Sequence, residues 1–451
     1  MTTQELLACT DRYHGKSAEG ATGVICTDPD CPAAPCVAWR AKQSEAAPVA
    51  NPPLQIDAVR TRIIAPTPAE VTEVTQSAGR GPSALVQLKA DMEANYSGFD
   101  WAAMELCLAA ILAHYAAKET QAIWPFIVGA PRTGKTEAVI RAFDALPAAY
   151  SAGDLTPKAL MSANDRKGLL QTLSEKGQSI VLFKDFTSML GKRIEDAAEV
   201  MAVLREIADG NYARWTGNGE VPPWQGKLTI IAGVTPQIEK HRAVIEVLGP
   251  RFLFIRWATP PARDVARQAI LQINHEMAIR EESQRLVRAI LAPRGLHLAE
   301  LLPDHLEAIV NYCVGFTKLR QPVDRDFKHH YIERVQDEEG AGAIAKHLNL
   351  IARSRAALWG RSVTNDEDLA LARRVAMDAL PQGRLAVYRH LLAGVTDVPE
   401  LAVLSRMDFP AVRSILTEFR AIGLVSWEDG VKGSLNLQVG DFPTQWLMGK
   451  T

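Results

Sequence analysis

The chain has 451 residues, which at a typical size of about 150 residues per domain predicts about three domains. Its 50 Lys and Arg residues almost balance its 52 Asp and Glu residues, which excludes a histone-like polybasic protein and an acidic solvating tail. Apolar residues make up 47% of the chain and charged residues 23%, so there is enough apolar material for folded cores.

The chain shows no sign of membrane insertion or export. Its most apolar stretch, residues 101–117, contains Glu105 and His114 and is too short and too polar to span a bilayer. The N-terminus lacks the basic start and apolar run of a secretory signal. Six cysteines in a chain of this length do not predict a disulfide framework. We therefore expect a cytoplasmic protein without a membrane partner.

The first 84 residues differ from the rest of the chain. Residues 1–40 contain four of the six cysteines, and we expect this Cys-containing segment to be poorly ordered. Residues 41–84 are rich in Ala, Pro, Thr and Gln and lack a regular apolar pattern, which is typical of a linker.

The N-terminal cysteines form a candidate zinc site. Cys26, Cys31 and Cys36 follow one another at a regular spacing, and His14 or Cys9 could supply a fourth ligand. Three thiolates and one further ligand suit tetrahedral Zn²⁺. The alternative is a set of free thiols in a loosely ordered tail.

Short apolar runs alternate with helical patterns in the middle of the chain. The runs cover residues 122–128, 179–183 and 228–234, and the helical patterns include residues 135–146 and 195–208. This alternation predicts an α/β fold with a parallel sheet. From about residue 260 the pattern is helical only, with clear helices over 344–359 and 366–379.

The strongest motif begins where the first apolar run ends. It matches the phosphate-loop pattern G-x-x-x-x-G-K-[ST] and lies between a predicted strand and a predicted helix. Its residues are Gly129, Ala130, Pro131, Arg132, Thr133, Gly134, Lys135 and Thr136. Glycines let successive backbone N–H groups point at phosphate oxygens, and a helix start adds partial positive charge. We expect ATP as the ligand, with Lys135 on its β- and γ-phosphates and the Thr136 hydroxyl on Mg²⁺.

A carboxylate follows the second apolar run. Four apolar residues place Asp185 at the carboxyl end of a strand, where doubly wound sheets bind ligands, so Asp185 is the expected second Mg²⁺ ligand. Residue 186 is Phe, so the acid that would activate water is not beside Asp185. Glu195, Asp196 or Glu206 could take that role.

The segment after the helix at 195–208 resembles the AAA+ ATPases. A helix, a hairpin-like stretch at 211–227 and a strand follow in the order of the pre-sensor insertion of MCM-type helicases, MoxR-like ATPases and enhancer-binding activators. The resemblance implies that Thr235 is the first sensor of the γ-phosphate. It also implies that Arg251 is an arginine finger for a neighbouring subunit. The alternative for Arg251 is an ion pair with an acid of its own fold.

The following helical region resembles the AAA+ lid. The resemblance divides the ordered chain into an ATPase core at 85–258 and a helical lid at 259–380. It places Lys346 near the position of the second sensor on the nucleotide, with Arg353 two turns later. A solvent-exposed helix face is the alternative for both side chains.

Residues 381–451 resemble a winged helix-turn-helix domain. Three short helices, the third N-capped by Asp408, precede a hairpin-like pair of apolar segments. In such domains the third helix enters a DNA groove. Acidic and basic residues balance in this region, so a protein-docking module is the alternative.

Together these resemblances imply an ATP-hydrolysing AAA+ ring, expected to be a hexamer, that acts on single-stranded or forked DNA as an MCM-like helicase or replication initiator. Arg214, Trp215 and Lys227 would face the central pore of the ring. A compact chain of this kind is typical of phages and mobile elements. The alternatives are a MoxR-like ATPase that remodels protein partners and a low-turnover ATP-dependent switch.

Overall fold

The structure, a computed structural model, describes most of the chain after residue 81. The described ranges are 82–118, 121–153, 155–160, 168–190, 194–216, 219–241, 251–292, 296–326, 331–429, 435–440 and 443–448. The zinc prediction for His14, Cys26, Cys31 and Cys36, like the predicted linker before residue 82, lies outside the described residues.

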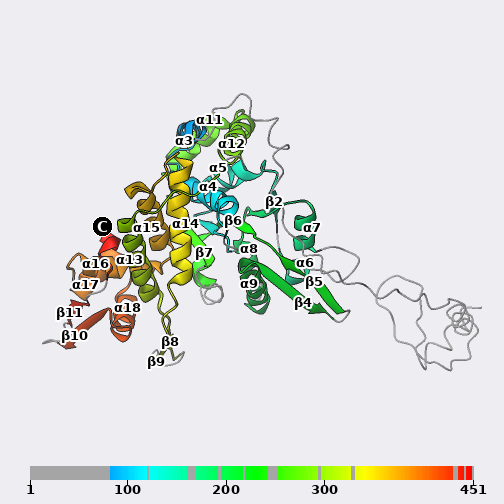
Figure 1. Cartoon of the computed structure of the whole chain (residues 1–451). Helices are drawn as coiled ribbons and strands as arrows, with labels where there is room; N and C mark the ends of the chain where they lie inside the picture. The colour runs from blue at the N-terminus through cyan, green and yellow to red at the C-terminus, as the bar shows by residue number, and fades with distance from the viewer. Residues whose placement is uncertain are drawn as a thin grey trace, which may run out of the picture. The chain divides into compact units, whose positions relative to one another are not determined.

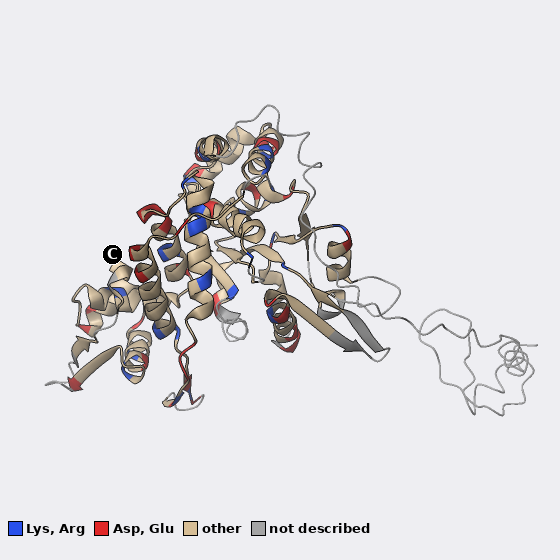
Figure 2. Ribbon diagram, viewed as in Figure 1, with Lys and Arg blue, Asp and Glu red and all other residues tan. Residues whose placement is uncertain are grey.

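A five-stranded parallel sheet forms the centre of the described chain (Figure 1). The strands, in the order β2-β3-β6-β1-β7, are Ala149–Ala152, Ile180–Phe183, Thr229–Val234, Trp124–Val128 and Phe252–Arg256. The three inner strands are buried along their whole length, as expected for parallel strands covered on both faces. They carry no charged residue, so they are tan in Figure 2. The α/β fold with a parallel sheet is confirmed.

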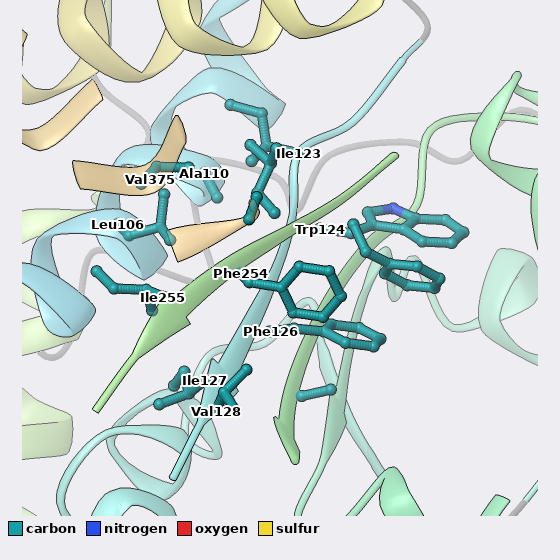
Figure 3. Packing of buried hydrophobic residues seen from close by; sticks show 14 of the residues in the cluster. Leu106, Ala110, Ile123, Trp124, Phe126, Ile127, Val128, Phe254, Ile255 and Val375 are labelled. Carbon is teal, nitrogen blue, oxygen red and sulfur yellow. The ribbon is translucent and has the colours of Figure 1, made fainter. Parts of the chain in front are cut away.

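Helix α4 (Trp101–Ala116) covers one side of this sheet. It is apolar on nearly every face, and its buried residues run from Ala103 to His114. Figure 3 shows Leu106 and Ala110 of α4 near Ile123 and the β1 side chains, with Ile255 of β7 and Val375 of α15 (Asp366–Asp378) beside them. The core therefore joins the sheet to helices that precede and follow it in the chain.

The other elements before residues 259–380, which we call the lid region after the prediction, are short, apart from α3 and α9. They are α3 (Pro82–Asn95), α5 (Lys135–Ala138), η1 (Ile140–Phe143), α6 (Pro157–Leu160), α7 (Leu169–Glu175), α8 (Thr187–Leu190), α9 (Ile194–Ala208), β4 (Asn211–Thr216), β5 (Gly219–Gln225) and η2 (Pro236–His241). Strands β4 and β5 pair as the predicted antiparallel hairpin.

The predicted helix at 135–146 forms in two pieces. The α-helix ends after Ala138, and Val139 has φ −109° and ψ −63° before a 3₁₀ turn follows. Val139 and Ile140 are adjacent β-branched residues, which lose side-chain freedom in a helix. The helix behind the phosphate-loop motif is thus one turn long.

The lid region contains five helices within its described part: α11 (Ala262–Gln272), α12 (Glu276–Ile290), α13 (Pro303–Arg320), α14 (Gly342–Leu358) and α15. The prediction of a purely helical pattern is wrong here, because Val323–Arg325 (β8) and Ile332–Val335 (β9) form a hairpin. Both strands are short and carry alternating charges, which leaves no apolar run to reveal them.

Two ion-pair groups, one buried and one partly exposed, join helices of the lid region to the rest of the core. Arg355 of α14 contacts Glu105 of α4 at 3.1 Å and Asp368 of α15 at 2.8 Å. Arg374 of α15 donates to Asp100, directly before α4, and to the Arg256 carbonyl at the end of β7. Breaking a buried pair leaves an uncompensated charge, so α14 and α15 are firmly held against the core.

The C-terminal region folds as three helices and a hairpin. They are α16 (Gln382–Leu392), α17 (Val398–Ser405), α18 (Phe409–Ala421), β10 (Val425–Asp429) and β11 (Leu435–Val439), followed by a 3₁₀ turn, η5 (Gln445–Met448). Asp408 caps α18 by accepting the Ala411 N–H at 2.9 Å. The buried side of α18 carries Val412, Ile415, Leu416 and Phe419.

This region shares its core with the lid. The rings of Trp446 and Tyr312 of α13 lie 5.0 Å apart, and both side chains are buried. Arg384 donates to the Leu319 and Gln321 carbonyls at the end of α13. Within the described ranges, no helix is both long enough and apolar enough to cross a membrane.

Candidate phosphate-binding site

The loop at 129–134 turns sharply where β1 ends. Arg132 and Gly134 have left-handed backbone conformations, with φ of 61° and 88°. A loop that alternates between right- and left-handed residues turns neighbouring N–H groups to one side and forms a concavity for anions. Glycine is also required at residue 129, because a Cβ at this position would lie 2.9 Å from the Trp257 Cβ.

Hydrogen bonds hold the loop in this conformation. The Thr133 hydroxyl donates to the Ala130 carbonyl at 2.8 Å, and the Trp257 indole N–H donates to the Thr133 carbonyl at 3.2 Å. The Gly129 N–H donates to Val234 of β6 at 3.0 Å. Pro131 and Arg132 remain exposed at the loop tip. The loop is therefore preorganised for a ligand.

Lys135 lies buried beneath this loop, with only 6% of its surface exposed. Its ammonium donates to the Ala130 carbonyl at 3.1 Å. Burial lowers the pKa of Lys135, and the Asp185 carboxylate opposes that effect. A buried cation facing a neutral carbonyl is poorly compensated, and an anion in the loop would compensate it.

The sheet register brings the other predicted residues to the same edge. Val128 pairs with Val234 and Phe183 pairs with Ala232, so Gly129, Thr235 and Asp185 all follow the carboxyl ends of adjacent parallel strands. The Thr136 hydroxyl donates to the Lys184 carbonyl at 3.3 Å, which joins the loop helix to the end of β3.

Thr235 combines one satisfied group with one unsatisfied group. Its N–H donates to the Thr187 hydroxyl at 2.8 Å. Its own hydroxyl oxygen is buried and has no hydrogen-bond partner among the described residues. Leaving such a group unpaired costs about 1–3 kcal/mol, so a ligand or a water molecule at this position would stabilise the site.

Asp185 presents an exposed carboxylate at the end of β3. One oxygen accepts the Thr187 N–H at 2.9 Å and so caps α8. Thr136 and Asp185 supply one hydroxyl and one carboxylate, which is the small donor set that suits Mg²⁺ on a nucleotide. No cluster of three or more His, Cys, Asp or Glu side chains that could hold a metal by itself occurs in the described part of the chain.

Phe186 is a core residue. It is fully buried, and its ring lies 4.9 Å from that of Phe126 and 5.4 Å from that of Phe183. An acid could not replace it without burying a charge. Glu195 and Asp196 are exposed at the start of α9, whereas Glu206 lies near the other end of that helix. No hydrogen bond in the described ranges assigns any of the three to the site.

Arg251 lies at the opposite edge of the sheet. The next residue, Phe252, pairs with Trp124, the first residue of β1. A five-residue strand, about 16 Å long, therefore separates Arg251 from the loop of its own chain. Arg251 donates three hydrogen bonds to the Asp209 carboxylate, two from Nη2 at 2.8 and 2.9 Å and one from Nε at 3.3 Å.

Lys346 is exposed on α14, and no contact among the described residues joins it to the loop. Two residues that the sequence analysis did not single out are near the loop instead. Arg280 of α12 donates to Glu137, next to Thr136, at 2.6 Å. The Tyr96 ring lies 4.0 Å from where a Cβ on Gly134 would be, and burial with the Glu137 charge raises the Tyr96 pKa to about 12.

The hairpin prediction needs one correction. Arg214 and Trp215 lie on β4, in register with Val221 and Glu220. Lys227, however, follows the hairpin, and its ammonium donates to the Ala113 and Ala117 carbonyls at 3.1 and 3.2 Å. It lies at the C-terminal end of α4, where a cation is favoured.

Comparison with known protein families finds no matching family model, and comparison with curated proteins finds no significant match.

Proposed function

We propose that this chain is an ATP-binding and ATP-hydrolysing protein of the AAA+ type that acts as a homo-oligomeric ring on DNA. One observation carries the nucleotide part of the proposal. A preorganised loop lies over the buried ammonium of Lys135, on the sheet edge where Thr136, Asp185 and Thr235 also meet.

Each residue has a role in phosphoryl transfer. The loop N–H groups and Lys135 bind the β- and γ-phosphates and stabilise the charge that develops on them. Thr136 and Asp185 hold Mg²⁺, which neutralises phosphate charge when bound. The unpaired Thr235 hydroxyl orients the γ-phosphate or the attacking water.

The C-terminal region supports DNA as the substrate. On one side of α18, Glu418 pairs with Arg384 of α16 and with Arg325 of β8. The other side is exposed and carries Arg413 and Arg420, each over an aromatic ring: Phe409 at 5.8 Å and Trp427 at 4.5 Å. Guanidinium groups beside aromatic rings suit both phosphates and unstacked bases.

A low-turnover ATP-dependent switch is the second candidate. The observation in its favour is Phe186. At the position where an acid would activate water, the chain has this buried core side chain instead. In this function ATP binding would change the conformation of the chain, and slow hydrolysis would reset it.

ATP binding and ATP hydrolysis, each measured with and without single-stranded DNA, distinguish these functions. DNA-stimulated hydrolysis is the result expected for the proposed function. Turnover that ignores DNA would support a MoxR-like ATPase acting on protein partners. Tight ATP binding with negligible turnover would support the switch. The absence of ATP binding would contradict all three.

A further inference from the structure

Helix α11 turns an unusual face to solvent. None of its residues is buried. Gln268 and Gln272 donate to the Ala94 and Asn95 carbonyls at the end of α3. At 100° per residue the opposite face carries Arg263, Arg267 and Ile270.

The turn after α11 extends this face. Ile273 lies in the turn, and both Ile270 and Ile273 are 73% exposed. Arg263 and Arg267 form no ion pair with any described residue. We call Arg263, Arg267, Ile270 and Ile273 the basic surface. A short amphipathic helix gains most of its stability from packing. Packing of a partner against this face would therefore stabilise α11.

A second surface has the opposite charge. Leu302, the N-cap of α13, and Leu306 and Val310 of that helix recur every four residues and are 38–49% exposed. Glu307 is exposed beside Val310, and Asp304 is exposed further round the helix. Neither pairs with a cation in the described ranges. We call these five residues the acidic surface.

The start of α15 lies next to the acidic surface and adds to its charge. The Leu302 N–H donates to the Thr364 hydroxyl at 3.3 Å. Asp366, two residues later, has a 95% exposed side chain. The negative charge therefore extends beyond α13.

We propose that the basic surface of one copy of this chain packs against the acidic surface of a second copy. Both surfaces combine exposed aliphatic side chains with unpaired charges, and the charges are of opposite sign. Complementary patches at different places on one chain generate head-to-tail contacts between identical copies. The aliphatic residues supply the desolvated centre of the contact, and the charges set its orientation.

This contact would reach the candidate phosphate site. Helix α12 begins four residues after α11 ends, and its Arg280 pairs with Glu137 beside Thr136. Gln284 of α12 also donates to the Arg141 carbonyl of η1 at 2.9 Å. A second copy bound to the basic surface of α11 is thus connected to the loop through α12. This link to nucleotide state rests on the proposed function, whereas the contact itself does not.

Charge reversal tests the pairing. One variant carries Arg263→Glu and Arg267→Glu, and the other carries Asp304→Lys and Glu307→Lys. Each alone should lose the assembly that the wild type forms in sedimentation or mass photometry. Their equimolar mixture should regain it, because each reversed surface meets its reversed complement while the unreversed surfaces meet one another. Lys176→Glu, an exposed charge change at the end of α7, is the matched control.

Thermal unfolding of the same variants shows whether each variant is folded. ATP binding by the same variants tests the nucleotide site separately. A wild type that stays monomeric with and without nucleotide would overturn the proposal. So would variants that keep the wild-type assembly, a loss in only one of the two, or a mixture that stays dissociated. The assembly measurement can therefore contradict the contact while ATP binding is retained. Equally, loss of ATP binding can contradict the proposed function while the contact is retained.

Discussion

Arg251 and Asp209 form a two-point ion pair at the amino-terminal edge of the central sheet, the opposite edge from the phosphate loop. Arg251 cannot reach the phosphates of its own chain from there. It either serves the site of a neighbouring copy or fixes β7 to the end of α9. Two variants distinguish these roles: one removes the arginine, and the other removes only the charge of Asp209.

Arg251→Ala should retain ATP affinity and lose hydrolysis by about 10³-fold or more, the effect of an arginine finger. Asp209→Asn breaks the same ion pair but keeps the arginine, so its hydrolysis should stay near the wild-type rate. The pair is partly exposed, so each variant should lose only about 1 kcal/mol of unfolding free energy. Equal losses of activity in the two variants would assign the pair to folding alone.

Mixed assemblies extend this test. Lys135→Ala subunits keep Arg251, and Arg251→Ala subunits keep the phosphate loop. Some interfaces in a mixture would hold both intact parts, so hydrolysis should partly return. No recovery in subunits shown to co-assemble would argue against a shared site.

Replacing both Arg413 and Arg420 by Ala should weaken DNA binding and lower the slope of log affinity against log salt by about 1 per lost phosphate contact. Arg389→Ala, an exposed charge change on α16, is the matched control and should leave the slope unchanged. Affinity measured over a series of salt concentrations checks this. An unchanged slope in the double variant would remove α18 from the DNA surface.

Gly315→Ala should destabilise the protein although Ala is the better helix former by about 1 kcal/mol. A Cβ at this position of α13 would lie 2.9 Å from the Trp446 indole nitrogen, so the C-terminal region must shift. Overpacking of this kind costs about 1–3 kcal/mol. Gly342→Ala is the control, because nothing lies within 4 Å of its Cβ position. Thermal unfolding should show a lower Tm for the first variant only.

His114 should make the unfolding free energy depend on pH. Burial, followed by the charge of Lys227, lowers its pKa from 6.5 to about 3, and its Nδ1 lies 3.0 Å from the Thr229 hydroxyl. The unfolded chain then binds more protons than the folded chain below pH 6.5, so stability falls as pH falls. Between about pH 6.5 and pH 5 the loss is about 2 kcal/mol.

The variant His114→Gln should not show this part of the loss. Denaturant unfolding at several pH values measures the difference. Parallel curves for the two proteins would contradict a neutral, buried His114.

The sequence predicted the inner strands of the sheet because parallel strands covered on both faces form unbroken apolar runs, as in β1, β3 and β6. It did not predict β2 or β7. Both are edge strands, and neither lies in one of the apolar runs at 122–128, 179–183 and 228–234. The hairpin of β8 and β9 has no apolar run at all, and Arg325 of β8 instead donates to Glu418 and to the Ser414 carbonyl of α18.

The phosphate-loop residues could be predicted because they are adjacent in the chain and their spacing has a physical cause. Arg280 and Tyr96 could not, because α12 and the α3–α4 connection reach the loop only through tertiary packing. The AAA+ resemblance predicted Lys346 from its place near the start of a lid helix, but α14 packs on α4 and leaves that side chain exposed. Chain distance does not show which face a long helix turns toward a site.

Calorimetric titration of Mg-ATP into the wild type, Lys135→Ala and Lys184→Ala shows whether the loop above Lys135 binds ATP. Lys184 is an exposed lysine at the same sheet edge, so its loss controls for a simple change of charge. The wild type and Lys184→Ala should bind ATP alike. Lys135→Ala should lose charge-assisted hydrogen bonds worth about 1.5–3 kcal/mol each, which weakens binding by at least about tenfold. Equal ATP affinity in Lys135→Ala and the wild type, or no binding by any of the three, would contradict the account.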